Sequence, residues 1–167
     1  EADRAVFANT YEASMNYGAE GAGGITITKQ MNGRPLAANE FEFTITGNDD
    51  KSAEKLADAD KRFTNSTQAA AGRTVSMRKF RSMTFDQNDA GEIFSFTVAE
   101  TKPAENALPG VAYDQSTYTV TIEVFDDGDG SMHTLTTVVK HTPDADDVTI
   151  VDQARSDIEG YTAPSFG

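Results

Sequence analysis

The sequence predicts an all-β protein built as a sandwich of antiparallel sheets. Apolar residues alternate with Thr, Ser or Glu in four separate runs, a pattern typical of strands that bury one face and expose the other. The runs are rich in Thr, Val, Ile, Phe and Tyr, the residue types that favour strands. Turn-forming residues separate these short runs, which favours a β-sandwich.

The alternating runs lie, in chain order, at residues 25–29, 41–45, 94–98 and 118–124. The Asp- and Gly-rich residues 126–130 then predict a hairpin turn that leads into a further strand at residues 133–139. A last short strand is expected at residues 147–151.

Residues 51–61 interrupt the β pattern, because they are rich in helix formers and follow Asp49 and Asp50, either of which can cap a helix. They predict a short helical insertion with Leu56 as its apolar anchor. Near the start, a strand-like piece at residues 6–11 precedes a small, polar, Gly-rich stretch at residues 12–24, which predicts a linker. We therefore expect an N-terminal segment with its linker, residues 1–23, and a sandwich domain, residues 24–167.

Composition excludes several functions. The net charge of −13 repels phosphate backbones and anionic lipid surfaces, and no apolar run approaches the roughly 20 residues that span a bilayer. Because Cys is absent and the two His have no partner nearby in the sequence, thiolate metal sites, disulfides and His-based catalysis are not expected. No cofactor is expected. Two acidic stretches, residues 86–92 and 126–130, lack the full spacing of a calcium loop and are interpreted as turns.

Three polar residues occur at positions where the alternation predicts an inward side chain. Lys29 follows Ile25 and Ile27 on the same face of its strand, and Glu100 continues the face of Phe94, Phe96 and Val98. Asn9 lies between Phe7 and Tyr11 in the N-terminal piece. The sequence thus predicts a Lys, a Glu and an Asn facing the core from separate strands.

These three residue types suggest one reaction. Burial favours the neutral amine of a Lys and the protonated carboxyl of a Glu. A neutral amine can attack the carboxamide of an Asn while the carboxyl carries the proton, which leaves an isopeptide bond and releases ammonia. The alternatives are that the Lys29 side chain extends to water or that Lys29 and Glu100 form a simple ion pair.

Four motifs, in the same order along the chain, resemble the isopeptide-linkage domain of Gram-positive pilins. The first is the run from Lys29 through Gly33-Arg34-Pro35-Leu36 to Glu40-Phe41-Glu42-Phe43, and the second is the aromatic strand that ends at Glu100. The third is Gly110-Val111-Ala112-Tyr113-Asp114 with the strand after it, and the fourth is Phe7-Ala8-Asn9-Thr10-Tyr11. The resemblance covers most of residues 24–140.

The resemblance implies an immunoglobulin-like sandwich of the collagen-adhesin B type, with a Lys29–Asn isopeptide bond and Glu100 as catalyst. In the family the reactive Asn is on the last strand, whereas Asn9 is at the start of this chain. Three interpretations stay open. Asn9 belongs to a preceding repeat, with the partner of Lys29 after Gly167; or it folds back as a permuted last strand; or it enters a neighbouring molecule.

Two functional hypotheses follow. The first is a structural shaft or repeat module of a pilus or surface adhesin, extracellular and attached to the cell wall, which contacts neighbouring repeats or identical subunits head to tail. Its self-modification happens once and is not enzymatic turnover. The second is an adhesin module of the same fold that binds a host surface ligand, with residues 51–73 as its binding surface and no cross-link. The chain, which starts at Glu1 without a secretion signal, is interpreted as part of a longer protein.

Overall fold

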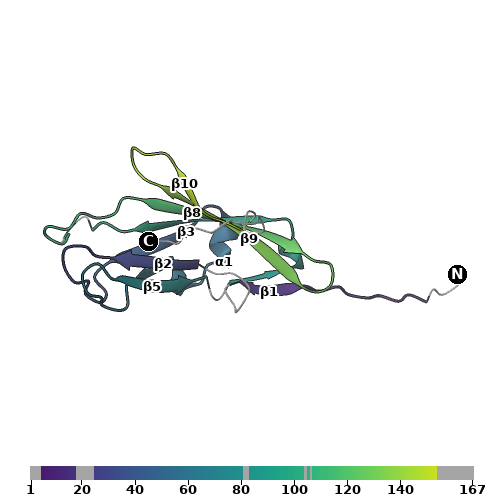
Figure 1. Cartoon of the computed structure of the whole chain (residues 1–167). Coiled ribbons are helices and arrows are strands. Elements are labelled where there is room, and N and C mark those ends of the chain that lie inside the picture. Colours follow the sequence, from purple (N-terminus) through teal and green to yellow (C-terminus); the bar gives the residue numbers. More distant parts are fainter. Residues whose placement is uncertain (1–4, 18–24, 81–82, 104, 106, 154–167) are drawn as a thin grey trace.

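The computed structural model describes residues 5–17, 25–80, 83–103, 105 and 107–153. Its strands lie in two layers, and the N-terminal residues extend away from one end of the body (Figure 1). Every strand pair among the described residues is antiparallel. The all-β sandwich predicted from the sequence is therefore confirmed.

The larger layer is a six-stranded sheet that contains the five predicted strands that follow residues 25–29. Its two longest strands form the hairpin of β8 and β9, in which Thr117 pairs with His141 and Asp126 with Met132. The strand order is β10 (Val148–Asp152), β9 (Met132–His141), β8 (Thr117–Asp126), β7 (Ile93–Glu100), β3 (Glu42–Gly47) and β4 (Arg62–Thr64).

The second layer consists of two strand pairs. β2 (Ile25–Gln30) pairs with β5 (Thr74–Lys79), and β1 (Ser14–Tyr17) pairs with β6 (Met83–Asp86). In Figure 1, β1 and β2 follow one another along the same layer, with β5 beside β2. This layer covers one face of the six-stranded sheet.

The core lies between the layers and is rich in aromatic rings. Phe94 and Phe96 point inward from β7 and are at most 1% exposed. Phe85 and Phe80 contact them from the second layer at centroid distances of 5.0 and 5.1 Å. Each ring of this size contributes about 1.5–3 kcal/mol when fully buried, so this contact is a main source of the attraction between the layers.

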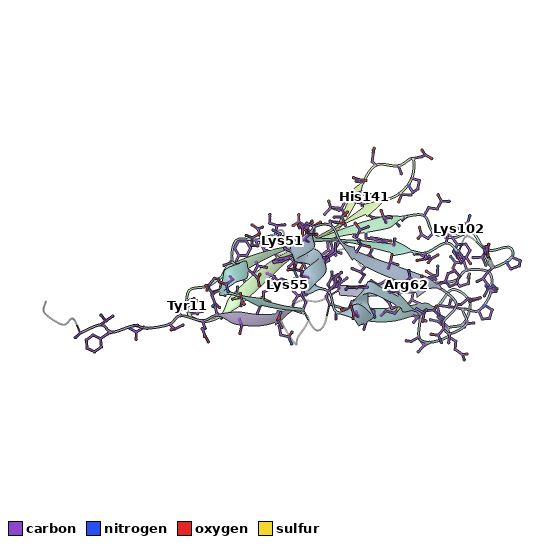
Figure 2. The ribbon with its side chains drawn as sticks, turned by 180° about the vertical axis from the view of Figure 1, so that it is seen from behind. Tyr11, Lys51, Lys55, Arg62, Lys102 and His141 are labelled. Carbon is purple, nitrogen blue, oxygen red and sulfur yellow. The ribbon has the colours of Figure 1, made fainter. Side chains whose placement is uncertain are left out.

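The helical insertion predicted at residues 51–61 is divided into two short helices. It forms α1 (Asp50–Lys55) and α2 (Asp58–Lys61), separated by an extended backbone at Leu56, whose side chain is buried. Asp49 caps α1 by accepting a hydrogen bond from the Ser52 N–H. The lysines of α1 face the body, where Lys51 and Lys55 pair with Glu92 and Asp89 (Figure 2).

The predicted linker at residues 12–24 differs from the structure in its first half. Ser14–Tyr17 forms β1, because Tyr17 is fully buried against Phe80 and Phe85 and its hydroxyl contacts that of Thr136 at 2.5 Å. One buried aromatic side chain thus converts a polar, Gly-flanked stretch into a strand. Residues 18–24, Phe166 and Gly167 lie outside the described residues.

Candidate functional site

Lys29, near the end of β2, and Glu100, at the end of β7, contact each other between the two layers. The Lys29 Nζ donates to Glu100 Oε2 at 2.7 Å, and the two side chains are 12% and 6% exposed. The other oxygen, Glu100 Oε1, is buried and has no hydrogen-bond partner among the described residues. A buried carboxylate oxygen without a donor is costly, so this atom marks a place where a further donor group would be stabilised.

The strand pattern explains why these two side chains face each other. Ile25 and Ile27 point into the core from β2, and Lys29 continues their face at the end of the strand. Glu100 ends β7 on the face of Phe94, Phe96 and Val98, and it pairs in register with Phe43 of β3. The inward placement predicted for Lys29 and Glu100 thus follows from period-two alternation on two strands of different layers.

A cavity of about 220 Å³ opens beside this pair. Its lining includes Lys29 and Glu100 together with polar groups at its rim, among them Asn32 and Asp114. The apolar part of the lining comes from both layers and includes Ile25, Ile27, Phe43, Val98, Tyr118 and Val120. The cavity therefore combines an apolar wall with a Lys–Glu pair, and a strand with one polar side chain among apolar ones would match it.

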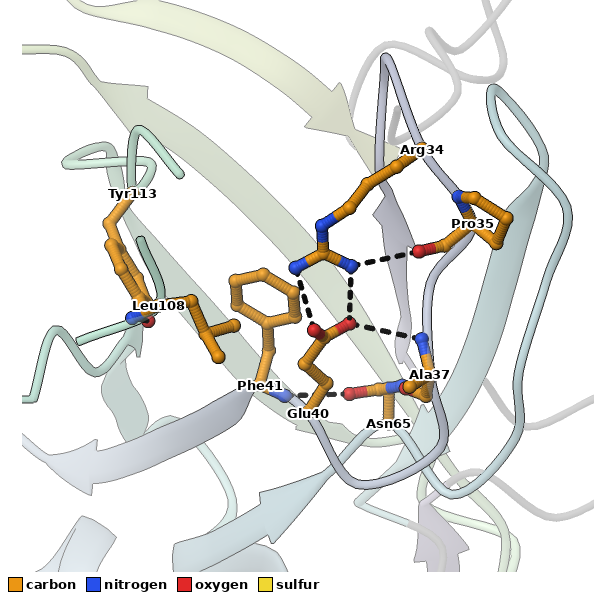
Figure 3. A network of polar contacts seen from close by, with 8 residues as sticks. All are labelled: Arg34, Pro35, Ala37, Glu40, Phe41, Asn65, Leu108 and Tyr113. Atoms are coloured by element: carbon orange, nitrogen blue, oxygen red, sulfur yellow. Dashed lines mark hydrogen bonds and ion pairs between the residues drawn. The ribbon is translucent and has the colours of Figure 1, made fainter. Parts of the chain in front are cut away.

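The ring of Phe41 holds the ammonium group of Lys29 from another side. The Nζ atom lies 4.1 Å from the ring centroid, within the range of a cation–π contact. Phe41 is 1% exposed, and its backbone N–H donates to Asn65 Oδ1 at 2.9 Å. Figure 3 shows Asn65 and the Arg34–Glu40 pair next to Phe41, with Leu108 and Tyr113 on its other side. These residues position the ring that Lys29 contacts.

The Asn65 side chain forms hydrogen bonds with the backbone at three positions near Phe41. Besides accepting from Phe41, it donates from Nδ2 to the carbonyls of Ala37 and Thr67 at 2.7 and 3.0 Å. The side chain is fully buried, so its removal would leave these backbone groups without partners.

Asn65→Ala is therefore expected to lower the free energy of unfolding by about 2–4 kcal/mol, since each buried group left unpaired costs about 1–3 kcal/mol. Urea unfolding followed by circular dichroism measures this. Asn32→Ala, at an exposed Asn of the same loop region, serves as control and should change stability by less than about 1 kcal/mol. Equal effects of the two substitutions would contradict the structural role given to Asn65.

Glu40 is held as a carboxylate by its neighbours. It accepts from Arg34 at 2.7 and 3.1 Å and from the Ala37 N–H at 3.0 Å. The Arg34 hydrogen bonds are the largest cause that lowers the pKa of Glu40; the Ala37 N–H and the more distant charge of Lys29 lower it further. The charged form is thus stabilised in the fold.

This lowered pKa predicts a pH-dependent contribution to stability. The folded pKa of Glu40 lies below the unfolded value of about 4.3, so the contribution is complete above that pH and is lost as the pH falls through the folded pKa. Wild type should be more stable than Glu40→Gln at pH 7, and the difference should shrink below about pH 4. Arg34→Gln should reproduce this trend in urea unfolding, whereas a difference that is constant with pH would contradict it.

Asn9 is not brought to the Lys29–Glu100 pair. It lies in an extended, exposed segment, residues 5–12, termed the N-terminal tail, which contains no strand among its described residues. The tail is attached to the body at Tyr11, whose hydroxyl donates to Asp126 Oδ1 at 2.6 Å and accepts from the Gly130 N–H at 3.2 Å (Figure 2). The predicted inward placement of Asn9 therefore differs from its place in this chain, because no second layer covers the tail.

The acidic stretches serve as turns, as their spacing predicts. Asp86 caps the short 3-10 helix Gln87–Asp89 and forms a capping box with Asp89. In the β8–β9 hairpin, Asp126 and Asp129 accept from the N–H groups of Gly128 and Ser131. No group of three or more potential ligands that could hold a metal ion occurs among the described residues.

Comparison with known proteins supplies the family. Residues 25–154 match the model of the FctA family, whose description is "Spy0128-like isopeptide containing domain". The chain belongs to the FctA family. Searches of curated proteins and of solved structures gave no match.

Membership of the FctA family establishes the general role. It confirms the resemblance to pilin isopeptide domains and supports a structural module of a pilus or adhesin, not an enzyme. The family also implies association with other pilin subunits and an extracellular location at the cell surface. In the described part of the chain, no helix has the length and apolarity needed to cross a membrane.

Three contributors to this FctA site are not evident from the sequence. The alternation predicts only a strand position for Phe41, although its ring contacts the Lys29 ammonium. Asn65 and the Arg34–Glu40 pair act on Phe41 from loops, where alternation gives no prediction. A signal exists for Arg34 and Glu40, since opposite charges in one short loop can pair, but their relation to Lys29 depends on the folded loop.

Proposed function

We propose that this chain is a shaft module of a surface pilus or adhesin in which Lys29 forms an isopeptide bond with an Asn carboxamide, with Glu100 as the proton carrier. The observation that supports this most directly is the 2.7 Å contact between Lys29 Nζ and buried Glu100 Oε2, beside an apolar cavity and an unpartnered Glu100 Oε1. In this proposal residues 24–167 form the module, residues 1–23 connect it to its neighbour, and the assembly is attached to the cell wall.

The reaction can be written with these groups alone. A proton moves from Lys29 Nζ to Glu100 Oε2, which leaves a neutral amine and a neutral carboxyl. The amine attacks the carboxamide carbon, and the carboxyl donates a hydrogen bond to the carbonyl oxygen. One C–N bond forms and the bond to the amide nitrogen breaks. The departing nitrogen takes the carboxyl proton, the attacking nitrogen passes its extra proton to Glu100, and ammonia carries that proton away as ammonium. Glu100 is regenerated.

The fold would accelerate the reaction by holding the amine and the amide in contact. An amine does not ordinarily displace ammonia from an amide in water, but groups held in contact reach effective concentrations of about 10⁵–10⁸ M. An apolar strand that filled the cavity would also exclude water from it, which would strengthen the electrostatic interactions of Glu100. Asn9 is the Asn that the sequence motif assigns to this reaction, and the modules would then follow one another head to tail.

Intact mass after denaturation tests this function. One ammonia is lost for each bond formed, and Lys29→Arg should retain the full mass because its guanidinium does not react. Lys51→Arg provides a matched control, since Lys51 also pairs with a carboxylate, Glu92, but lies outside the cavity and is largely exposed. The proposal would be overturned if the wild-type chain kept its full mass even when mixed with each candidate partner that carries an Asn-containing strand. The remaining function would then be the ligand-binding module, with Lys29–Glu100 as an ion pair.

A further inference from the structure

The cavity beside Lys29 and Glu100 has the features of a site for an added β-strand. β5 is the strand that pairs with β2 among the described residues, and the cavity lies along β2 from Ile25 to Gln30. Glu100 Oε1 is buried without a hydrogen-bond donor among the described residues, and only 6% of the Glu100 side chain is exposed. An occupant therefore needs apolar side chains along β2 and a donor group opposite Glu100.

Asn32 does not meet this need, although it lines the cavity. Its Oδ1 accepts from the side chain of Gln30 at 3.2 Å, and the residue is exposed. It is also only three residues from Lys29 in the same chain segment, so it cannot act as a strand laid beside β2.

The N-terminal tail has the properties that the cavity requires. Val6 and Phe7 are 78% and 92% exposed, an unusual state for large apolar side chains in a soluble domain. Residues 5–11 carry no charge, so they can approach another copy of this acidic chain without repulsion. If Asn9 is aligned with Lys29, strand periodicity aligns Phe7 with Ile27 and Ala5 with Ile25, so that apolar residues face the apolar wall.

The tail cannot reach the cavity of its own chain while β1 stays paired. The register places Lys29 opposite Val75 and Ser14 opposite Asp86. The paired parts of β5 and β6 between these residues span about 23 Å at about 3.3 Å per residue, before the link from Lys79 to Met83 is counted. From Asn9 to Ser14 an extended chain reaches at most about 18 Å, and Figure 1 shows β2 pointing away from the tail.

We propose that residues 5–11 of a second copy add to β2 as a parallel strand and place Asn9 against Lys29 and Glu100. This inference rests on the proposed function and names the partner of its site. The new bond joins Lys29 Nζ of the acceptor copy to the Asn9 side-chain carbonyl carbon of the donor copy, and ammonia leaves. The Asn9 carbonyl oxygen accepts from the Glu100 carboxyl, and its amide nitrogen donates to the carboxyl oxygen that lacks a donor.

Parallel addition has a consequence for the assembly. The tail and β2 run in the same direction through the molecule (Figure 1), so a donor and its acceptor point the same way along the strand axis. The contact of Tyr11 with Asp126 and Gly130 fixes the length of tail that projects from the donor. Repeated addition of residues 5–11 to the cavity beside Lys29 therefore gives a head-to-tail row.

Complementation between two inactive variants tests the proposal. Lys29→Ala can only donate a tail, and Asn9→Ala can only accept one. Each alone should stay monomeric on a denaturing gel and retain its full mass, whereas their mixture should give a covalent dimer that has lost one ammonia, with residues 29 and 9 joined in the peptide map. Wild type should form a ladder that lengthens with concentration, and Asn88→Ala, at an exposed Asn outside the cavity lining, should form the same ladder.

Other outcomes separate this inference from the proposed function. A wild-type monomer that loses ammonia would show that the bond closes within one chain. Cross-linking only to a version extended past residue 167 by an Asn-containing strand would show that the donor is a different strand. Either result would rule out the tail as the donor but would leave the proposed function intact. No ammonia loss with any partner would overturn both. If Lys29→Ala does not fold by circular dichroism, Lys29→Arg replaces it as donor, because its tail is unchanged.

Discussion

Replacing Glu100 with alanine is expected to slow formation of the Lys29 cross-link by about 10²–10⁴-fold, the usual contribution of a positioned acid–base group. The variant keeps the amine and the cavity but loses the carboxyl to which Lys29 Nζ donates at 2.7 Å, which is the proposed proton carrier. Glu100→Gln should be as slow, because an amide of nearly the same shape cannot carry the proton. The time course of ammonia loss by intact mass measures both rates.

Glu123→Ala is the matched control for this experiment. Glu123 is also a strand carboxylate, on β8, but it occupies the opposite parity to the buried Ile122 and Val124 and lies outside the cavity lining. Its removal should leave the rate within about twofold of wild type. A Glu100→Ala variant that cross-links as fast as Glu123→Ala would show that the carboxyl of Glu100 carries no proton in the reaction.

Gly47→Ala is expected to lower the free energy of unfolding by about 3 kcal/mol or more, a large loss for one added methyl group. Gly47 ends β3 directly beneath α1, and a Cβ at this position would lie 2.3 Å from the Ala53 backbone nitrogen and 2.5 Å from its Cα. These are main-chain atoms of a helix, so the added carbon can be accommodated only if α1 moves off the sheet. Thermal and urea unfolding measure the effect.

Gly33→Ala separates this close approach from backbone strain. Gly33 has a φ of +85°, with no atom within 4 Å of the position of an added Cβ. Its substitution should therefore cost only the strain of the left-handed conformation, about 1–2 kcal/mol. If Gly33→Ala proved as damaging as Gly47→Ala, the contact between α1 and β3 would not be the reason for the glycine at position 47.

The pairing of Lys29 with Glu100 could be predicted from the sequence because both residues extend clear apolar alternation. Ile25 and Ile27 fix the face of Lys29, and Phe94, Phe96 and Val98 fix that of Glu100, so strand periodicity alone sets both directions. Periodicity does not tell which strands lie opposite one another. The family motifs supplied that part, and the register of Phe43 with Glu100 shows how β3 completes the site.

Other elements could not be predicted because their signal depends on tertiary contacts. β5 and β6 lie in a stretch that contains several basic residues and breaks its alternation at Phe80, which has a φ of +65° and a fully buried ring. β1 has a single fully buried anchor, Tyr17, next to glycines that indicate a linker. In both places a few contacts with the opposite layer outweigh weak local preference.

The place of Asn9 shows a different limit of sequence reasoning. The alternation of Phe7, Asn9 and Tyr11 describes a strand with one apolar face, and the structure leaves that face uncovered in the single chain. A pattern of side chains states that a face is to be buried but not which molecule buries it. For Asn9 the answer depends on the distance along β5 and β6, which only the register provides.

The pairing of β1 with β6 also determines how the module bears tension. The tail continues the line of β1 away from the body (Figure 1), so a pull on residues before Glu12 loads the Ser14–Tyr17 ladder along the strand axis. Its hydrogen bonds are then sheared together, and they do not open one after another from an end. The Tyr17 ring, which packs against Phe80 and Phe85, resists the same sliding. This short strand therefore resists a pull applied to the tail.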